Sequence, residues 1–186
     1  MGTPKKRVLI HQIQNSLTNL EDTLDYFRPH YVFLLSSDFY SKDKPDMALM
    51  EINHKNIRAL GDNVVNIEYS ELVTIEEAWH KTTMLHVYEI FGQIKSKCEE
   101  MAGKDGCIFY AGLADGPALM TVGIAFAAVL YKMKTYFTRG RRTYYHGDYV
   151  LEIDNLNKIT EIRSWLEQNY LNPKNLRYLN EIIELE

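Results

Sequence analysis

Short apolar runs, separated by segments long enough for a helix, constrain the fold of this 186-residue chain more than any other feature. A strand buried on both faces of a parallel sheet is apolar at successive positions. On this basis we expect six strands, at 7–13, 31–35, 64–69, 107–111, 135–138 and 149–153. The first four alternate with helical patterns at 18–28, 46–60, 75–101 and 117–131. This order predicts an α/β fold with a mainly parallel sheet and helices on both faces.

Local signals indicate where several elements begin. Thr74 and Glu77 have the spacing of an N-terminal capping box, so they are expected to open the longest helix. Pro117 suits a first helical turn, and the helix after it is apolar almost all round, so it needs cover on more than one side. The last two strands are expected to form a C-terminal β-hairpin. Two short helices, 156–170 and 173–184, are expected to close the chain. The first and fourth strands should be adjacent at the sheet centre, since they are the most continuously apolar.

The composition excludes several classes of protein. The net charge is −4, so the chain as a whole is not a basic nucleic-acid binder, and direct nucleic-acid binding is not expected. Cys98 and Cys107 have no metal or redox spacing, and the six histidines show no ligand pattern. We therefore expect no metal, no cofactor and no disulfide framework. No apolar run reaches the roughly 18 residues of a membrane span, and residues 8–10 are too few for a signal-peptide core. The expected location is the cytoplasm.

The loops after the strands are the first candidates for a ligand site, because open α/β sheets bind ligands at the carboxyl ends of their strands. The candidate residues in these loops are Gln14, Asn15, Ser16, Ser36, Ser37, Asp38, Gly112, Asp115 and Gly116. The loop 112–116 is bracketed by glycines at a helix N-terminus, where exposed backbone N–H groups attract an anion. A tight turn with Asp115 as the helix N-cap explains the same residues without a ligand.

A second candidate is the arginine turn between the last two strands, made by Arg139, Arg141 and Arg142. Guanidinium groups pair with phosphates in forked geometry, and the neighbouring Tyr144 and Tyr145 could stack on bases. A solvated hairpin tip is the alternative explanation. If the turn closes over an anionic ligand, these arginines are expected to meet its phosphates.

The stretch YAGLADGPALMTVGIAFAAVLYKMKTYF, residues 110–137, resembles the core of the CRISPR-associated Rossmann-fold (CARF) sensor domains. In many of these a strand is followed by N-x-T-G-G-T-K-x-M and an alanine-rich buried helix. Gly116 matches the second motif glycine and Met120 the methionine. The order of elements over 7–153 is also similar. The chain departs from the motif at Ala114, Asp115, Pro117 and Ala118, the last of which replaces the motif lysine.

The resemblance implies a Rossmann-like domain over 1–153, with 154–186 as a C-terminal helical appendage. It also implies a stand-alone sensor in CRISPR antiviral defence, which binds a cyclic oligoadenylate-type nucleotide at a homodimer interface. A ligand with two-fold symmetry suits such a dimer, because each subunit supplies an identical half-site. Since the motif lysine is absent, we expect a sensor rather than a ring nuclease.

Two other functions stay open on the sequence alone. One is a small doubly wound enzyme acting on a nucleotide or sugar phosphate, with Asp38 or Asp115 as the acid or base and His11 and Tyr40 nearby in sequence. The other is a DNA-binding regulator that uses the arginine turn and the C-terminal helices. The net charge and the acidic end, 181–186, argue against the regulator.

Overall fold

The elements of the fold come from a computed structural model, which describes residues 4–13, 18–37, 67–75, 78, 80, 82–114, 116–138 and 150–153. In chain order they are β1 (Lys6–Gln12), α1 (Thr18–Phe27), β2 (Tyr31–Ser37), β3 (Tyr69–Ile75), α4 (Thr83–Ala102), β4 (Cys107–Gly112), α5 (Ala118–Leu130), β5 (Lys134–Thr138) and β6 (Val150–Ile153). Strand and helix alternate along most of this order, as the sequence predicted.

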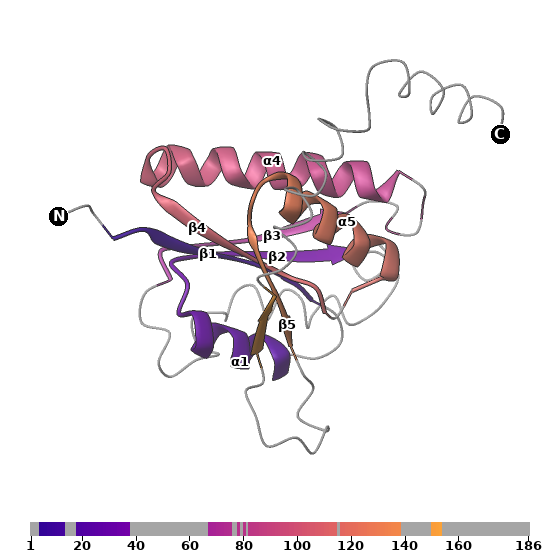
Figure 1. Cartoon of the computed structure of the whole chain (residues 1–186), viewed down its shortest axis with the longest axis horizontal. Coiled ribbons are helices and arrows are strands. Elements are labelled where there is room, and N and C mark those ends of the chain that lie inside the picture. The colour runs from indigo at the N-terminus through magenta and orange to yellow at the C-terminus, as the bar shows by residue number, and fades with distance from the viewer. Residues whose placement is uncertain are drawn as a thin grey trace, which may run out of the picture.

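The strands form one sheet in the order β3-β2-β1-β4-β5-β6 (Figure 1). Neighbouring strands are parallel except β5 and β6, which pair antiparallel. β1 and β4 are adjacent at the centre, with Leu9 opposite Tyr110, which confirms the expected placement. Because β1 to β4 all run in the same direction, their carboxyl ends lie at one edge of the sheet. That edge is where a ligand site is expected.

Helices cover both faces of the sheet, with α4 and α5 on one face and α1 on the other (Figure 1). Successive residues of β1 therefore enter different cores. Val8 and Ile10 belong to the cluster with Phe91 of α4, whereas Leu9 belongs to the cluster with Leu24 of α1. Burial on both faces is the reason that β1 is apolar at successive positions.

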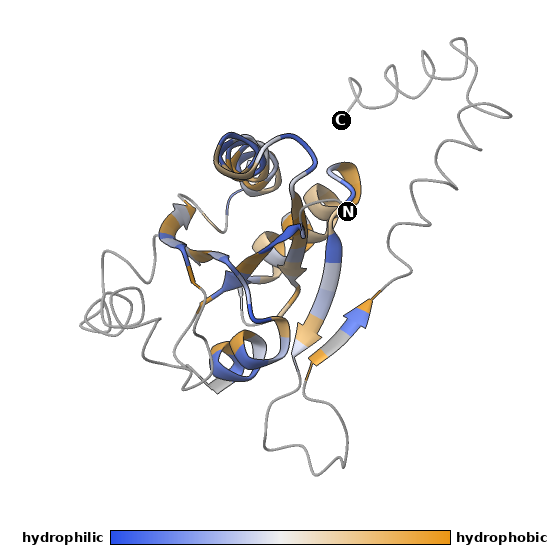
Figure 2. Cartoon of the chain, turned by 90° about the vertical axis from the view of Figure 1, so that its left-hand side faces the viewer, coloured by the Kyte–Doolittle hydropathy of each residue, from blue (hydrophilic) through white to orange (hydrophobic). Residues whose placement is uncertain are grey.

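α5 lies against α4 at close range. A Cβ added at Gly123 would lie 3.2 Å from the Met84 Cα and from the Val87 Cβ, so the two backbones approach closely there. Further along, the rings of Tyr88 and Tyr131 stack with centroids 5.0 Å apart. Figure 2 shows hydrophobic colours along α5, while α1 and α4 also carry hydrophilic residues. The apolar character predicted for this helix therefore reflects contact with both the sheet and α4.

Two predictions in the middle of the chain are wrong. The third strand is Tyr69–Ile75 rather than 64–69, and α4 begins at Thr83 rather than at 75. β3 is an edge strand, and its sequence YSELVTI mixes polar and apolar residues and lacks the continuous apolar run that marks a central strand. Thr74 consequently lies in this strand and opens no helix. α4 instead follows a turn in which the Thr83 hydroxyl donates to the His80 carbonyl oxygen at 2.6 Å.

Several predicted segments lie outside the described residues: the helix 46–60, the arginine turn, and the helices 156–170 and 173–184. The proposed boundary at 153/154 also stays a prediction. Within the described ranges, no helix is both long and apolar enough to span a membrane. The same part of the chain contains no group of three or more His, Cys, Asp or Glu side chains that could hold a metal ion.

Replacing Phe91 by alanine tests the packing of α4 on the sheet. Phe91 is fully buried in the core beneath α4, so Phe91→Ala should lower the free energy of unfolding by about 3–5 kcal/mol. Gln93→Ala changes an exposed residue of the same helix and should stay within about 0.5 kcal/mol of the wild type. Urea denaturation of both variants provides the comparison. Equal stability of the two variants would contradict the assigned face of α4.

Candidate functional site at the carboxyl edge of the sheet

Gln12 is the last residue of β1, and its side chain joins that strand to the first turns of α5. The side chain is fully buried, and its Nε2 donates to the Gly112 carbonyl oxygen at 3.2 Å. The same nitrogen lies 3.2 Å from Thr121 Oγ1 of α5. A buried amide needs such partners, because a buried polar group without them costs about 1–3 kcal/mol. Gln12 therefore holds the ends of β1 and β4 and the start of α5 in fixed relation.

Gly116 brings the backbone of the β4–α5 loop directly against Gln12. A Cβ at this position would lie 1.5 Å from Gln12 Oε1, so any side chain here would displace the buried amide. The N-cap of α5 is Pro117, which makes no side-chain cap hydrogen bond, rather than Asp115. The first-turn N–H groups of α5 consequently have no side-chain acceptor at the cap position. Such groups at a helix N-terminus favour an anion.

Ser36 and Ser37 end β2, the neighbour of β1, and both are buried. The Ser36 hydroxyl donates to the Ser37 carbonyl oxygen at 3.1 Å. Side chains alternate along the strand, so Ser37 faces the same side of the sheet as Phe33 and Leu35, the side covered by α4 and α5. Within the described part of the chain, the Ser37 hydroxyl has no hydrogen-bond partner. A buried hydroxyl of this kind can receive a polar group from a ligand.

His11 and Tyr136 form a buried pair on the opposite side of the sheet. His11 Nδ1 lies 2.7 Å from Tyr136 Oη, and the rings are stacked with centroids 6.2 Å apart. A Cβ at Gly112 would lie 2.7 Å from the same Tyr136 oxygen, so the glycine is needed here for space. Burial lowers the pKa of His11 to about 4, so its ring is neutral at pH 7. The pair packs against the end of β4 from the α1 side of the sheet, and it brings no charge to the site.

The structure brings four of the predicted site residues to the carboxyl edge: Ser36, Ser37, Gly112 and Gly116. The others lie outside the described residues, and their part in the site stays a prediction: Gln14, Asn15, Ser16, Asp38, Asp115, Arg139, Arg141 and Arg142. Sequence reasoning missed Gln12 and Thr121 as members of the site. A polar residue that interrupts an apolar run at the end of a buried strand is the signal that could have marked Gln12.

Comparison with known proteins shows which solved structures share this fold. No protein-family model and no curated protein sequence matches the chain. Among solved structures, Csm6 from Enterococcus italicus bound to cyclic hexa-2'-fluoro-hexa-dAMP superposes with a TM-score of 0.65 at 12% identity. The match covers 95% of this chain and 50% of that protein.

Two further structures match with lower scores. A type III CRISPR defence DNA nuclease activated by cyclic oligoadenylate gives a TM-score of 0.55 at 15% identity, over 82% of this chain and 20% of that one. Protein VC1899 from Vibrio cholerae gives a TM-score of 0.51 at 6% identity. That match covers 80% of this chain and 36% of VC1899. The chain is therefore structurally similar to CARF-domain proteins over most of its length, with a Rossmann-like α/β fold. It spans half or less of the length of these proteins.

The buried His11 should make folding stability depend on pH. Its pKa is about 4 in the folded chain and near 6.5 when unfolded, so the unfolded chain binds the proton more tightly. The free energy of unfolding should therefore fall as pH drops from 6.5 to 4, by up to about 3 kcal/mol from this residue. A His11→Asn variant should lack this part of the dependence in urea denaturation at a series of pH values. Identical pH profiles for the variant and the wild type would contradict the assignment.

Proposed function

We propose that this chain is a sensor that binds a cyclic oligoadenylate-type nucleotide across a two-fold axis between two copies, in CRISPR antiviral defence. The observation that carries the proposal is the set of buried polar groups at the carboxyl edge, on the sheet face covered by α4 and α5. It is supported by the similarity of the fold to proteins whose structures contain, or are activated by, such nucleotides. The cytoplasm is the compartment in which this role would be carried out.

The groups at the carboxyl edge suit a ligand that carries both phosphates and polar base edges. The start of α5 offers backbone N–H groups to an anion, and Gly116 keeps that backbone free of a side chain. Ser37 adds a hydroxyl on β2, and Gln12 on the adjacent β1 holds the loop in position. Ala118 stands where the CARF motif has a lysine. The phosphates of the nucleotide would therefore depend on these backbone groups and on the arginine turn at 139–142.

The outer face of α5 supports the proposed homodimer. Four large apolar side chains lie on one stripe of this helix and are exposed in the single chain: Leu119, Val122, Phe126 and Leu130. The exposed Tyr88 stacks on Tyr131, next to the end of this stripe, and extends it onto α4. A contiguous exposed apolar patch of this kind is typical of an interaction surface. Since α5 begins at the candidate site, a second copy on this face would bring two such sites together.

The enzyme alternative receives less support. From the sequence, Asp38 or Asp115 is the candidate acid or base, with His11 nearby, but the His11 imidazole is buried, holds a hydrogen bond to Tyr136 and faces the α1 side of the sheet. A general base must reach the proton that it removes, and this ring points away from the candidate site. Asp38, Asp115 and Tyr40 lie outside the described residues, so no observation favours a catalytic pair at this edge. Binding without cleavage is therefore the function that we propose.

Calorimetry with cyclic tri-, tetra- and hexa-adenylate tests the nucleotide proposal. At least one of these rings should bind the full chain, with a stoichiometry of one ring for two chains. Gln12→Ala should weaken that binding by about tenfold or more, because it removes the contacts that hold the loop beside Gly116. Gln93→Ala removes the same functional group from the exposed face of α4 and should leave binding unchanged.

The outcomes of this titration are separable. If none of the three rings binds the wild type, the nucleotide proposal is wrong. If a ring binds but Gln12→Ala has the same affinity as Gln93→Ala, the nucleotide is bound elsewhere on the chain.

A charge placed on the α5 stripe tests the dimer. Phe126 is 57% exposed, and Phe126→Glu should convert a particle of twice 21.7 kDa into one of 21.7 kDa by light scattering. Tyr26→Glu changes a comparably exposed aromatic residue on α1, across the sheet, and should leave the mass unchanged. A wild-type mass of 21.7 kDa at all concentrations would refute the proposed homodimer.

A further inference from the structure

β3 is the strand at one edge of the sheet. It pairs with β2 in unbroken register over its whole length, from Tyr31 opposite Tyr69 to Ser37 opposite Ile75. No other described strand pairs with its outer side. Natural edge strands are usually guarded by lysine, proline, a bulge or short length. The sequence YSELVTI has neither lysine nor proline, and its pairing with β2 contains no bulge.

The one charged residue of β3, Glu71, is already engaged by its neighbours. Its Oε2 accepts hydrogen bonds from Lys97 Nζ of α4 and from the Tyr69 hydroxyl, each at 2.8 Å. Lys97 Nζ also lies 4.8 Å from the centroid of the Tyr69 ring. The hydrogen bond that Lys97 donates to Glu71 raises the pKa of Lys97, so the ammonium group stays charged at neutral pH and forms an ion pair with Glu71. Among the described residues, this ion pair offsets the negative charge of Glu71 at the edge.

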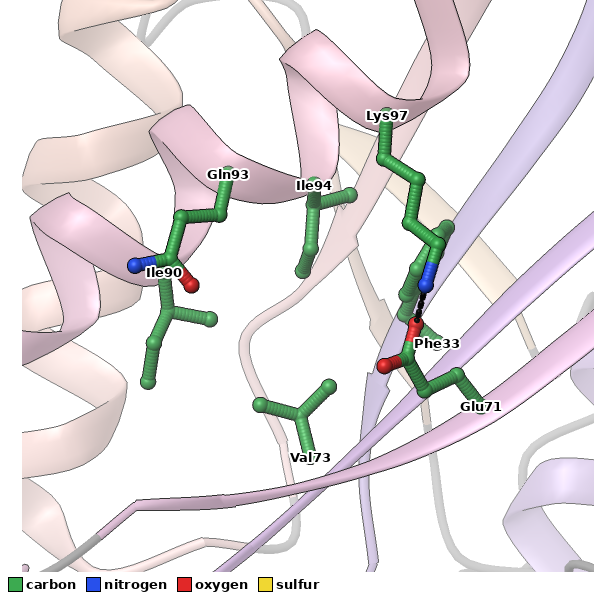
Figure 3. Close-up of a pocket in the computed structure, with 7 residues that line it drawn as sticks. All are labelled: Phe33, Glu71, Val73, Ile90, Gln93, Ile94 and Lys97. Atoms are coloured by element: carbon green, nitrogen blue, oxygen red, sulfur yellow. Dashed lines mark hydrogen bonds and ion pairs between the residues drawn. The ribbon is translucent and has the colours of Figure 1, made fainter. Parts of the chain in front are cut away.

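A pocket of about 150 Å³ opens between this edge and α4. Figure 3 shows Ile90 and Ile94 reaching from α4 toward Val73 of β3, with the Lys97–Glu71 pair closing one end. Phe33 and Ile94 are buried, whereas Val73 and Ile90 are partly exposed. The pocket is therefore apolar at its base and open at its rim. A protein cavity of roughly 150 Å³ can hold a benzene molecule, so this one has room for one aliphatic or aromatic side chain.

The free edge and the pocket are adjacent because Tyr69, Glu71 and Val73 all face α4. A strand added beside β3 would direct every second side chain toward the same space. We propose that this edge is a docking site for an extended segment of a partner protein. The segment pairs with β3 as a further strand and places one leucine-sized or phenylalanine-sized side chain in the pocket. Since Glu71 and Lys97 neutralise each other, uncharged polar residues flank that side chain. Main-chain pairing supplies affinity and the pocket supplies specificity.

Selection from a library of random peptides displayed on phage, with the full chain as bait, tests the docking site. The selected peptides should share one apolar residue between uncharged polar neighbours. A synthetic peptide of that sequence should slow hydrogen exchange at β3 amides. Val73→Phe fills the pocket and should weaken its binding by about tenfold or more in fluorescence anisotropy. Thr74→Phe adds the same ring on the opposite face of the same strand and should bind the peptide as the wild type does.

A second variant, Ile90→Trp, fills the same pocket from α4 and leaves β3 unchanged. It shows whether weaker binding by Val73→Phe comes from the filled pocket or from a disturbed strand. Both pocket variants should keep the circular dichroism and melting temperature of the wild type. Equal binding to Val73→Phe and Thr74→Phe would overturn the proposal. So would peptides that protect α5 and leave β3 unprotected. Full exchange protection of β3 in the free chain would also overturn it, because the edge would then be occupied by this chain or by a second copy.

Discussion

The buried amide of Gln12 is the contact on which the candidate site depends. It connects β1 to the carbonyl group at the end of β4 and to the hydroxyl of Thr121 in α5, which lie 100 and 109 positions away in sequence. Its burial obliges these partners to stay in place, because a buried amide without hydrogen bonds is costly. It also explains Gly116, which has no space for a side chain beside Gln12 Oε1. Gly112, Gly116 and Thr121 are therefore held in position around Gln12.

The two faces of the sheet have different roles: one supports the end of β4, and the other carries the proposed nucleotide site and dimer surface. On the α1 side, His11 and Tyr136 form a neutral buried pair that packs behind Gly112. On the other side, α4 and α5 lie over the polar groups of the carboxyl edge, and α5 leaves an apolar stripe exposed. The proposed nucleotide site and dimer surface thus share one helix, α5. The proposed peptide site lies at the β3 edge, so the two functions could operate without competing for the same residues.

Continuous apolar runs were enough to predict the central strands and α5, because burial on both faces leaves little choice of residue type. β3 was placed too early because this edge strand has no continuous apolar run, and Thr74, which lies in the strand, has the sequence spacing of a helix cap. At the site, Gly112 and Gly116 were predicted from their place after a strand. The role of Gln12 was not, because its partners come from β4 and α5 and only the folded chain brings them together.

The central claim is that the carboxyl edge around Gln12 receives the nucleotide. Nuclear magnetic resonance offers the most direct test, with the Gln12 side-chain amide assigned by its absence from a Gln12→Ala sample. Addition of the cyclic oligoadenylate that binds in calorimetry should shift this signal together with the backbone amides of Gly112, Gly116 and Thr121. The Tyr69, Glu71 and Lys97 group at the far edge should stay unchanged. Shifts confined to other regions, or an unchanged Gln12 signal at saturating nucleotide, would contradict the account.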